Sequence, residues 1–201
     1  MFCNEAARAG RLFPLDRRTI GTHNSPMSRI QTIAYEQADA KAQEIFDHYK
    51  KERGNVPNMF RTVAYRPEIL RTMIAHFRAV METGTVGAKL KELVIVRTSQ
   101  LNHCEYCLSS HTQLAHRYGW SEEQIADLAN FRQRTDFSDA EKAALELAER
   151  ETQDSNGVDD ELWARLRQYF DEGEIIELAA AIGLFNYFNR FNNSLRMEPT
   201  K

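Results

Sequence analysis

The sequence predicts an all-α fold, a compact bundle of about eight helices. Through most of the chain, apolar residues recur at the three- and four-residue spacing of a helix face. Two Ser-x-x-Gln/Glu patterns, beginning at Ser121 and Ser138, match the capping box that opens a helix. Residues 93–96 are strand-like in composition, but they keep a helical spacing with Leu90 and Leu101. Since no other segment resembles a strand, we expect helix there too.

Composition bounds the class of protein. The chain has 201 residues, of which 42% are hydrophobic and 27% charged, with a formal net charge of -3. These values are typical of one globular domain. Without a basic surplus there is no sign of a nucleic-acid partner, and no basic amphipathic segment points to a membrane surface. The longest apolar run, residues 178–185, is far too short to span a bilayer.

Residues 1–26 differ from the rest of the chain. They are rich in arginine, contain two glycines and two prolines, and show no helical stripe. They also lack the continuous apolar segment of a secretory signal. We therefore expect a flexible N-terminal extension over 1–26, with Cys3 as a bystander, and a helical domain over 27–201.

The expected helices follow in chain order from periodicity and from helix-ending residues. A turn is expected at residues 55–60, because Gly54 and Asn55 end one helix and Pro57 follows. A weak echo between residues 91–94 and 176–179 also suggests that the bundle has two similar halves. The helices are expected at residues 37–53, 67–83, 90–101, 104–118, 159–170 and 174–191, with two more after the caps at Ser121 and Ser138.

The chemistry of the chain is concentrated in residues 101–111. Cys104 and Cys107 form a Cys-x-x-Cys pair, and His111 follows four residues later. On a helix these positions share one face, so two thiols would lie beside a base. His111 could accept the proton of Cys107, and a helix N-terminus would favour negative charge at Cys104. The pattern alone does not divide the roles between the two thiols.

A carboxylate can complete this group. Glu92 lies twelve residues before Cys104, on the preceding helix. If the two helices form an antiparallel hairpin around Asn102 and His103, Glu92 can orient the ring of His111 and raise its basicity. Three cysteines in 201 residues do not make a disulfide scaffold. One isolated pair instead favours catalysis or metal binding in a reducing compartment, hence a cytoplasmic location.

Glu92, Cys104-Glu-Tyr-Cys107 and His111 resemble the motif of the alkylhydroperoxidase AhpD-like proteins in the carboxymuconolactone decarboxylase superfamily. The resemblance extends to Arg66-Pro-Glu68 and to Phe-Asn-Tyr-Phe-Asn-Arg at 185–190, and covers roughly residues 31–197. It implies an all-helical fold that assembles into trimers or hexamers. One departure concerns Tyr106, where better-known members have a histidine directly before the second cysteine.

The resemblance also implies a reaction, hydroperoxide reduction, and assigns roles. Cys107 would attack the peroxide and become a sulfenic acid, Cys104 would donate a proton and resolve it, and Glu92 and His111 would relay protons. We therefore expect a thiol-dependent hydroperoxide reductase with no metal, haem or flavin. An external dithiol or redox protein would regenerate the cysteine pair, because each turnover consumes two electrons.

Two alternatives stand beside this expectation. The first is a lactone decarboxylase, as in the other branch of the superfamily, which works without a cysteine pair. The second is a non-enzymatic redox or zinc-binding module, in which Cys104, Cys107 and His111 would bind zinc with His103 or His116 as a fourth ligand. Structural zinc usually joins two separate segments, whereas these candidates fall on one short stretch.

Overall fold

The structure, a computed structural model, describes residues 28–200 and confirms the all-α fold. The described residues contain no strand, and short 3₁₀ turns lie at Tyr35–Gln37, Leu128–Asn130 and Ser155–Gly157. The expected extension over 1–26, with Cys3, lies outside the described residues. The α-helices are α1 (Ala40–Arg53), α2 (Asn58–Val63), α3 (Pro67–Glu82), α4 (Ala88–Leu101), α5 (Glu105–Arg117), α6 (Glu122–Ala126), α7 (Asp139–Asp154), α8 (Asp160–Leu166) and α9 (Glu172–Leu195).

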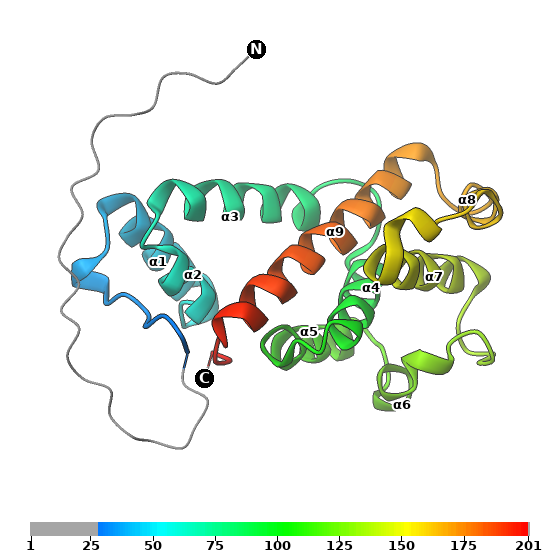
Figure 1. The fold of residues 1–201 in the computed structure, drawn as a ribbon, viewed down its shortest axis with the longest axis horizontal. Helices are drawn as coiled ribbons and strands as arrows, with labels where there is room; N and C mark the ends of the chain where they lie inside the picture. Colours follow the sequence, from blue (N-terminus) through cyan, green and yellow to red (C-terminus); the bar gives the residue numbers. More distant parts are fainter. Residues whose placement is uncertain (1–27, 201) are drawn as a thin grey trace, which may run out of the picture.

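Helix α4 is the centre of the bundle. It contacts α5, α7 and α9 more extensively than any other helices contact one another, and α9 crosses the middle of the molecule obliquely (Figure 1). All residues from 91 to 99 are buried, so α4 has no solvated face over two and a half turns. This confirms the helix expected there and explains its strand-like composition, because a helix enclosed on all sides needs apolar residues all round.

Successive residues of α4 belong to different parts of the hydrophobic core. Ile95 packs in a cluster with α1, α2, α3 and the two buried cysteines. Val94 joins a cluster formed with α7, α8 and α9, and Val96 joins one formed with α5 and α6. Each residue turns the helix by about 100°, which explains this distribution. Fully burying one such side chain contributes roughly 1.5–3 kcal/mol.

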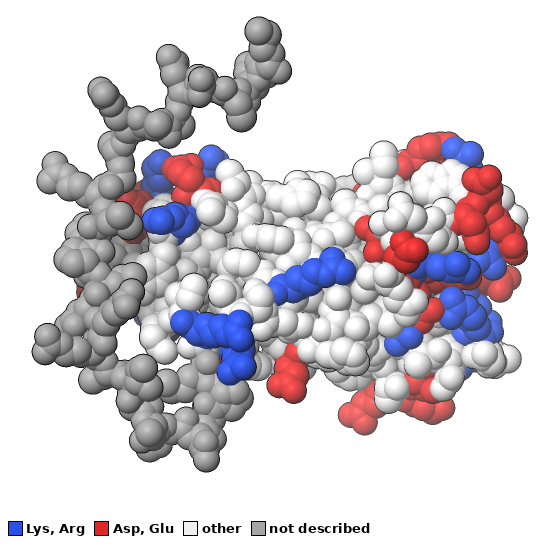
Figure 2. Space-filling model, viewed as in Figure 1, with Lys and Arg blue, Asp and Glu red and all other residues white. Residues whose placement is uncertain are grey.

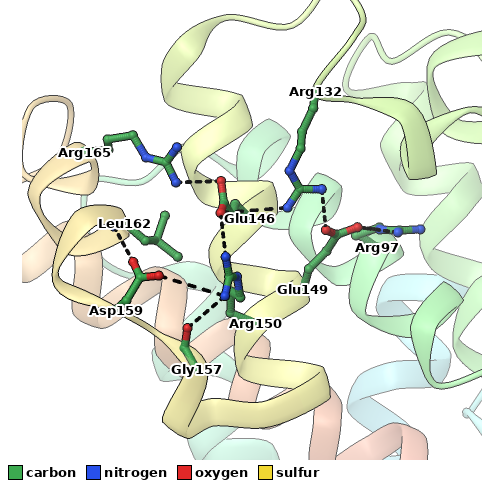
Figure 3. A network of polar contacts seen from close by, with 9 residues as sticks. All are labelled: Arg97, Arg132, Glu146, Glu149, Arg150, Gly157, Asp159, Leu162 and Arg165. Carbon is green, nitrogen blue, oxygen red and sulfur yellow. Dashed lines mark hydrogen bonds and ion pairs between the residues drawn. The ribbon is translucent and has the colours of Figure 1, made fainter.

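An ion-pair network fixes α4 against α7 (Figure 3). The guanidinium of Arg97 donates to the carboxylate of Glu149, which also accepts from Nη1 of Arg132 at 2.7 Å. One turn earlier on α7, Glu146 accepts from Arg165 of α8 at 2.7 Å. A buried guanidinium is tolerated only when its donors are paired, so the network balances the charge that α4 carries into the core.

Two expected boundaries near the start of the domain are wrong. The helix expected from residue 37 begins at Ala40, because Asp39 caps it by accepting the backbone N–H of Lys41. The turn expected over 55–60 ends at Pro57, and α2 begins directly after it. Met59, Phe60 and Val63 give α2 a buried helical face, but six residues are too few for periodicity to distinguish a helix from a turn.

The capping boxes at Ser121 and Ser138 are both present and open α6 and α7, as predicted. A third box, Asp171 with Glu174, starts α9 two residues earlier than expected. Helix α8 ends at Leu166, four residues before its expected end. The suggestion of two similar halves stays a prediction.

Charge is unevenly distributed over the surface. In the view of Figure 2, charged side chains gather at the end that carries α6, α7 and α8, whereas the middle of this face, over α9, is largely uncharged. No helix within residues 28–200 combines the length and apolarity needed to cross a membrane.

Candidate active site

The site is built on the sharp turn between α4 and α5. The backbone N–H groups of His103 and Cys104 donate to the carbonyls of Gln100 and Ser99, at 3.1 and 3.0 Å, and close the turn directly onto the end of α4. His103 has a φ of 52°, in the left-handed region that few non-glycine residues adopt. Its side chain is exposed. The turn reverses the chain and makes Cys104 the N-cap residue of α5.

The hairpin brings Glu92 and His111 together, which is the arrangement predicted from their positions on neighbouring helices. Oε2 of Glu92 lies 2.7 Å from Nδ1 of His111, and both side chains are largely buried. The His111 ring also meets the ring of Phe185 edge to face, with centroids 4.6 Å apart. The carboxylate therefore fixes the orientation of the imidazole and leaves Nε2 as the nitrogen able to exchange a proton.

The two cysteines are free thiols, and both are buried. The Cys107 thiol donates a hydrogen bond to Cys104, and this lowers the pKa of the Cys104 thiol to about 7 although burial opposes the shift. Backbone N–H groups of Tyr106 and Cys107, in the first turn of α5, lower the pKa of Cys104 further. The same thiol-to-thiolate bond, together with burial, raises the pKa of Cys107. The pair thus holds a single negative charge near neutral pH.

Helix α9 supplies a row of asparagines that holds this turn. Asn186 and Asn189 both accept hydrogen bonds from the side chain of Asn102, at 2.8 and 3.1 Å. One turn further on, Nδ2 of Asn192 lies 3.5 Å from Sγ of Cys107. Asn186 and Asn189 thus hold the turn through hydrogen bonds and do not line the cavity beside Cys107. Asn192 was missed in the sequence, although asparagines at three-residue spacing in an apolar helix are a visible signal.

A cavity of about 690 Å³ opens onto one of the two sulfurs. Cys107, His111 and Glu92 line it, together with the aromatic rings of Phe185 and Phe188. Cys104 does not line it and is completely buried behind. A small molecule in the cavity could therefore meet the Cys107 sulfur and the imidazole, with an apolar wall beside them.

Tyr106 also lines the cavity, but its hydroxyl is hydrogen-bonded to other parts of the chain. Its hydroxyl accepts the backbone N–H of Met59 at 3.0 Å and lies 3.3 Å from Oγ1 of Thr200. It therefore ties α5 to the start of α2 and to the C-terminal segment. The departure from the family motif at this position places a structural tether where the better-known members have a histidine.

The ligand set required by the zinc alternative is not assembled. Within residues 28–200, no three His, Cys, Asp or Glu side chains converge closely enough to hold a metal ion. His116, one suggested fourth ligand, directs Nδ1 to the backbone carbonyl of Trp120 at 2.9 Å. The other, His103, is exposed at the turn.

Comparisons with known proteins find relatives of this chain in sequence and in fold. A sequence model of the carboxymuconolactone decarboxylase family matches residues 67–150, which include the whole α4–α5 hairpin. The uncharacterized protein YdfG of Bacillus subtilis is 33% identical over 127 residues, which make up 63% of this chain and 86% of that protein. The uncharacterized protein YnjA of Escherichia coli is 39% identical over 107 residues, or 53% of this chain and 58% of YnjA.

Among solved structures, an uncharacterized peroxidase-related protein from Ralstonia eutropha JMP134, described as an alkylhydroperoxidase AhpD core, has a similar fold. The TM-score is 0.79 and the sequence identity 25%, and the match covers 88% of this chain and 94% of that one. The similarity in fold thus covers much more of the chain than the segment that the family model matches.

Proposed function

We propose that this chain, which belongs to the carboxymuconolactone decarboxylase family, is a thiol-dependent hydroperoxide reductase, an oxidoreductase that takes peroxide as electron acceptor. The main support for the proposal is the set of residues that line the cavity. Cys107, whose thiol shares a proton with the buried Cys104, lines the same cavity as His111, which is paired with Glu92. The description of the Ralstonia relative as peroxidase-related supports the same class of activity.

The first step would be attack by Cys107. The proton that Cys107 shares with Cys104 shifts to Cys104, and the Cys107 thiolate attacks the terminal oxygen of the hydroperoxide. A sulfur–oxygen bond forms as the oxygen–oxygen bond breaks, leaving Cys107 as a sulfenic acid. The departing alkoxide takes a proton from His111 and leaves as the alcohol. Glu92 stabilises the protonated ring that donates it.

The second step would be resolution by Cys104. Its sulfur attacks the sulfenic sulfur of Cys107, a disulfide forms, and the hydroxyl leaves with a proton as water. One hydroperoxide is thereby reduced to an alcohol and water, and two thiols are oxidised to one disulfide. An external dithiol or a redox protein would reduce the disulfide by thiol–disulfide exchange. We place this chemistry in the cytoplasm, where thiols are kept reduced.

Replacing the attacking sulfur tests the proposal. In a Cys3→Ser background, hydroperoxide consumption with a dithiol donor is expected to vanish in Cys107→Ser. Cys104→Ser should still consume about one equivalent of peroxide, but more slowly, because Cys107 supplies the sulfur that is oxidised but Cys104 no longer takes its proton. Its sulfenic acid should be trapped by dimedone. Full turnover by Cys107→Ser would overturn the proposal.

The family match supports a second candidate, decarboxylation of a carboxylated lactone from aromatic-ring breakdown. In that reaction Glu92 and His111 would exchange protons with the substrate, and neither cysteine would take part. Turnover of γ-carboxymuconolactone by a variant in which Cys104 and Cys107 are both serine would favour this function. Loss of peroxide turnover in the same variant, with no reaction of the lactone, would favour the first.

A further inference from the structure

Asn192, which contacts the sulfur of Cys107, has a side-chain oxygen for which the described residues offer no hydrogen-bond partner. Its side chain is 1% exposed, it lines the cavity, and its Nδ2 lies 3.5 Å from Sγ of Cys107. Its Oδ1 is buried and has no hydrogen-bond partner among the described residues. Buried carbonyl oxygens in proteins are nearly always paired, so an unpaired one beside a reactive sulfur calls for an explanation.

The neighbouring asparagines of α9 make the contrast clear. Asn186 accepts from Asn102 and donates to Oγ1 of Thr152 at 3.1 Å. Asn189 accepts from the same Asn102 and donates to Oγ of Ser99 at 3.1 Å. Each of these amides uses both its oxygen and its nitrogen within the protein. Asn192 alone of the three uses only its nitrogen, and it is the one that lines the cavity.

We propose that Asn192 is a further catalytic residue, whose Oδ1 accepts the hydrogen bond of the substrate's O–O–H group while its Nδ2 holds the attacking sulfur of Cys107. This inference rests on the proposed peroxidase function. A hydroperoxide carries one O–H donor, on the terminal oxygen that the thiolate attacks. On the cavity wall, Glu92 and His111 are paired with each other, whereas Oδ1 of Asn192 has no partner among the described residues. The carboxamide oxygen can therefore orient the substrate.

The carboxamide keeps its own protons throughout the step. The sulfur–oxygen bond forms and the oxygen–oxygen bond breaks, while the O–H proton stays covalently bound to the transferred oxygen and hydrogen-bonded to Oδ1. The product is Cys107–S–O–H, still hydrogen-bonded to Asn192. The alkoxide takes its proton from His111, as before. Asn192 thus contributes by positioning the O–H group of the hydroperoxide for attack.

If Asn192 has this role, its replacement should slow the reaction of Cys107 with hydroperoxide but not its reaction with a reagent that lacks a hydrogen-bond donor. Methyl methanethiosulfonate reacts with a thiolate but has no hydrogen-bond donor, so it can gain nothing from Oδ1. In Asn192→Leu, similar in size but without polar atoms, the second-order rate constant with tert-butyl hydroperoxide is expected to fall about 10- to 100-fold. The rate constant with methyl methanethiosulfonate should change less than about threefold, since Nδ2 provides only a long contact to the sulfur.

The control is Asn193→Ala, at the next position of α9. Asn193 is exposed, and its Nδ2 donates to the backbone carbonyl of Asn102 rather than to a sulfur. Its ratio of peroxide to methanethiosulfonate rates should equal that of the parent. Asn192→Ala also removes the carboxamide, and it enlarges the cavity instead of filling it. It repeats the test if the leucine variant does not fold. All variants carry Cys3→Ser.

The possible outcomes are distinct. A selective loss of the peroxide rate in the Asn192 variants supports the inference. Equal loss of both rates means that Asn192 acts only on the sulfur, and an unchanged peroxide rate means that it has no role; either overturns the inference and leaves the peroxidase function standing. If the unsubstituted protein consumes no peroxide, the proposed function itself fails, and the inference falls with it.

Discussion

At the scale of single residues, two thiols share one charge. Cys104 is the N-cap of α5, and first-turn N–H groups and the Cys107 thiol all favour a negative charge on its sulfur. Cys107 faces the cavity but holds the proton. The residue that is easiest to ionise is therefore not the one that substrate can reach. If the proton of Cys107 moves to the sulfur of Cys104, the negative charge moves to Cys107, where substrate can reach it.

The shared charge predicts how reactivity depends on pH. Only the thiolate reacts, and the pKa of Cys104 is lowered to about 7, so reactivity should be present above pH 7 and lost as pH falls through it. In the Cys3→Ser protein, the alkylation rate should rise about 10-fold between pH 6 and pH 8, with its midpoint at about 7. In Cys104→Ser the midpoint should move above that of an ordinary thiol, because burial raises the pKa of Cys107 more than the hydrogen bond from Asn192 or from Asn189 lowers it. A midpoint near 8.5 in the parent protein would contradict this account.

Glu92 has a role that can be separated from that of the thiols. In Glu92→Gln the imidazolium of His111 loses its carboxylate partner, so protonation of the leaving alkoxide is impaired. The rate with alkyl hydroperoxide should fall about 10- to 100-fold. Alkylation of the cysteines should change little. Glu122→Gln, an exposed glutamate on α6, is the control for loss of one charge. Equal effects on peroxide reduction and alkylation would show that Glu92 serves the fold or the thiols instead.

At the scale of elements, the hairpin of α4 and α5 could be predicted, but the surroundings of the site could not. The spacing of Glu92, Cys104, Cys107 and His111 determines which side chains meet once the chain reverses at residue 102. No such rule relates α9 to this turn. Asn192 reaches Cys107 across a tertiary contact between residues 85 positions apart. One sequence shows the row of asparagines but not what they contact.

The same distinction explains where the helix boundaries were wrong. Helices with side-chain caps of the Ser-x-x-Glu type begin where the sequence predicts. The six-residue α2 has no side-chain cap and depends on tertiary burial of Met59, Phe60 and Val63. The Ser-x-x-Gln/Glu patterns therefore located the starts of α6 and α7, whereas α2, which is stabilised mainly by packing, was missed.

A long-range clamp connects α9 to the loop before α4. The carboxylate of Glu177 accepts the backbone N–H groups of Thr85 and Val86, at 2.8 and 3.0 Å, and pairs with Lys91 at 3.0 Å. The Lys91 side chain is only 1% exposed. Gly84 lies against the same carboxylate with a φ of 89°, so a side chain there would clash. The clamp holds α4, and with it Glu92, in register with α9.

Glu177→Ala should therefore destabilise the protein. It leaves a buried ammonium without its counter-charge and two backbone N–H groups unpaired, which costs about 3 kcal/mol or more. Equilibrium unfolding in urea measures the change. Glu172→Ala, an exposed glutamate at the start of the same helix, should change the free energy of unfolding by less than about 0.5 kcal/mol. Equal stability of the two variants would show that the clamp contributes nothing.

At the scale of the whole molecule, the exposed apolar side chains of α9 suggest a surface where copies of the chain could meet. Ile176, with 67% of its surface exposed, and Tyr187, with 45%, both lie on α9. The middle of the face drawn in Figure 2, over α9, carries few charged side chains. We propose, in line with the resemblance noted from the sequence, that copies of the chain meet as a trimer or hexamer.

Sedimentation velocity measures the assembly directly. The unmodified protein should sediment as a trimer or hexamer. Ile176→Glu should shift it toward monomer, because a charge would be buried at the interface. Tyr169→Glu, which alters an exposed aromatic residue just after α8, should leave the mass unchanged. A monomeric unmodified protein at micromolar concentration would refute the proposed assembly.

The central claim is that hydroperoxide oxidises the cysteine pair. The most direct measurement adds one equivalent of alkyl hydroperoxide to pre-reduced Cys3→Ser protein, followed by thiol counting and peptide mass mapping. We expect that one peroxide is consumed per chain, that two thiols are lost, and that the peptides show a disulfide between Cys104 and Cys107. Peroxide left unreacted with both thiols still titratable would contradict it.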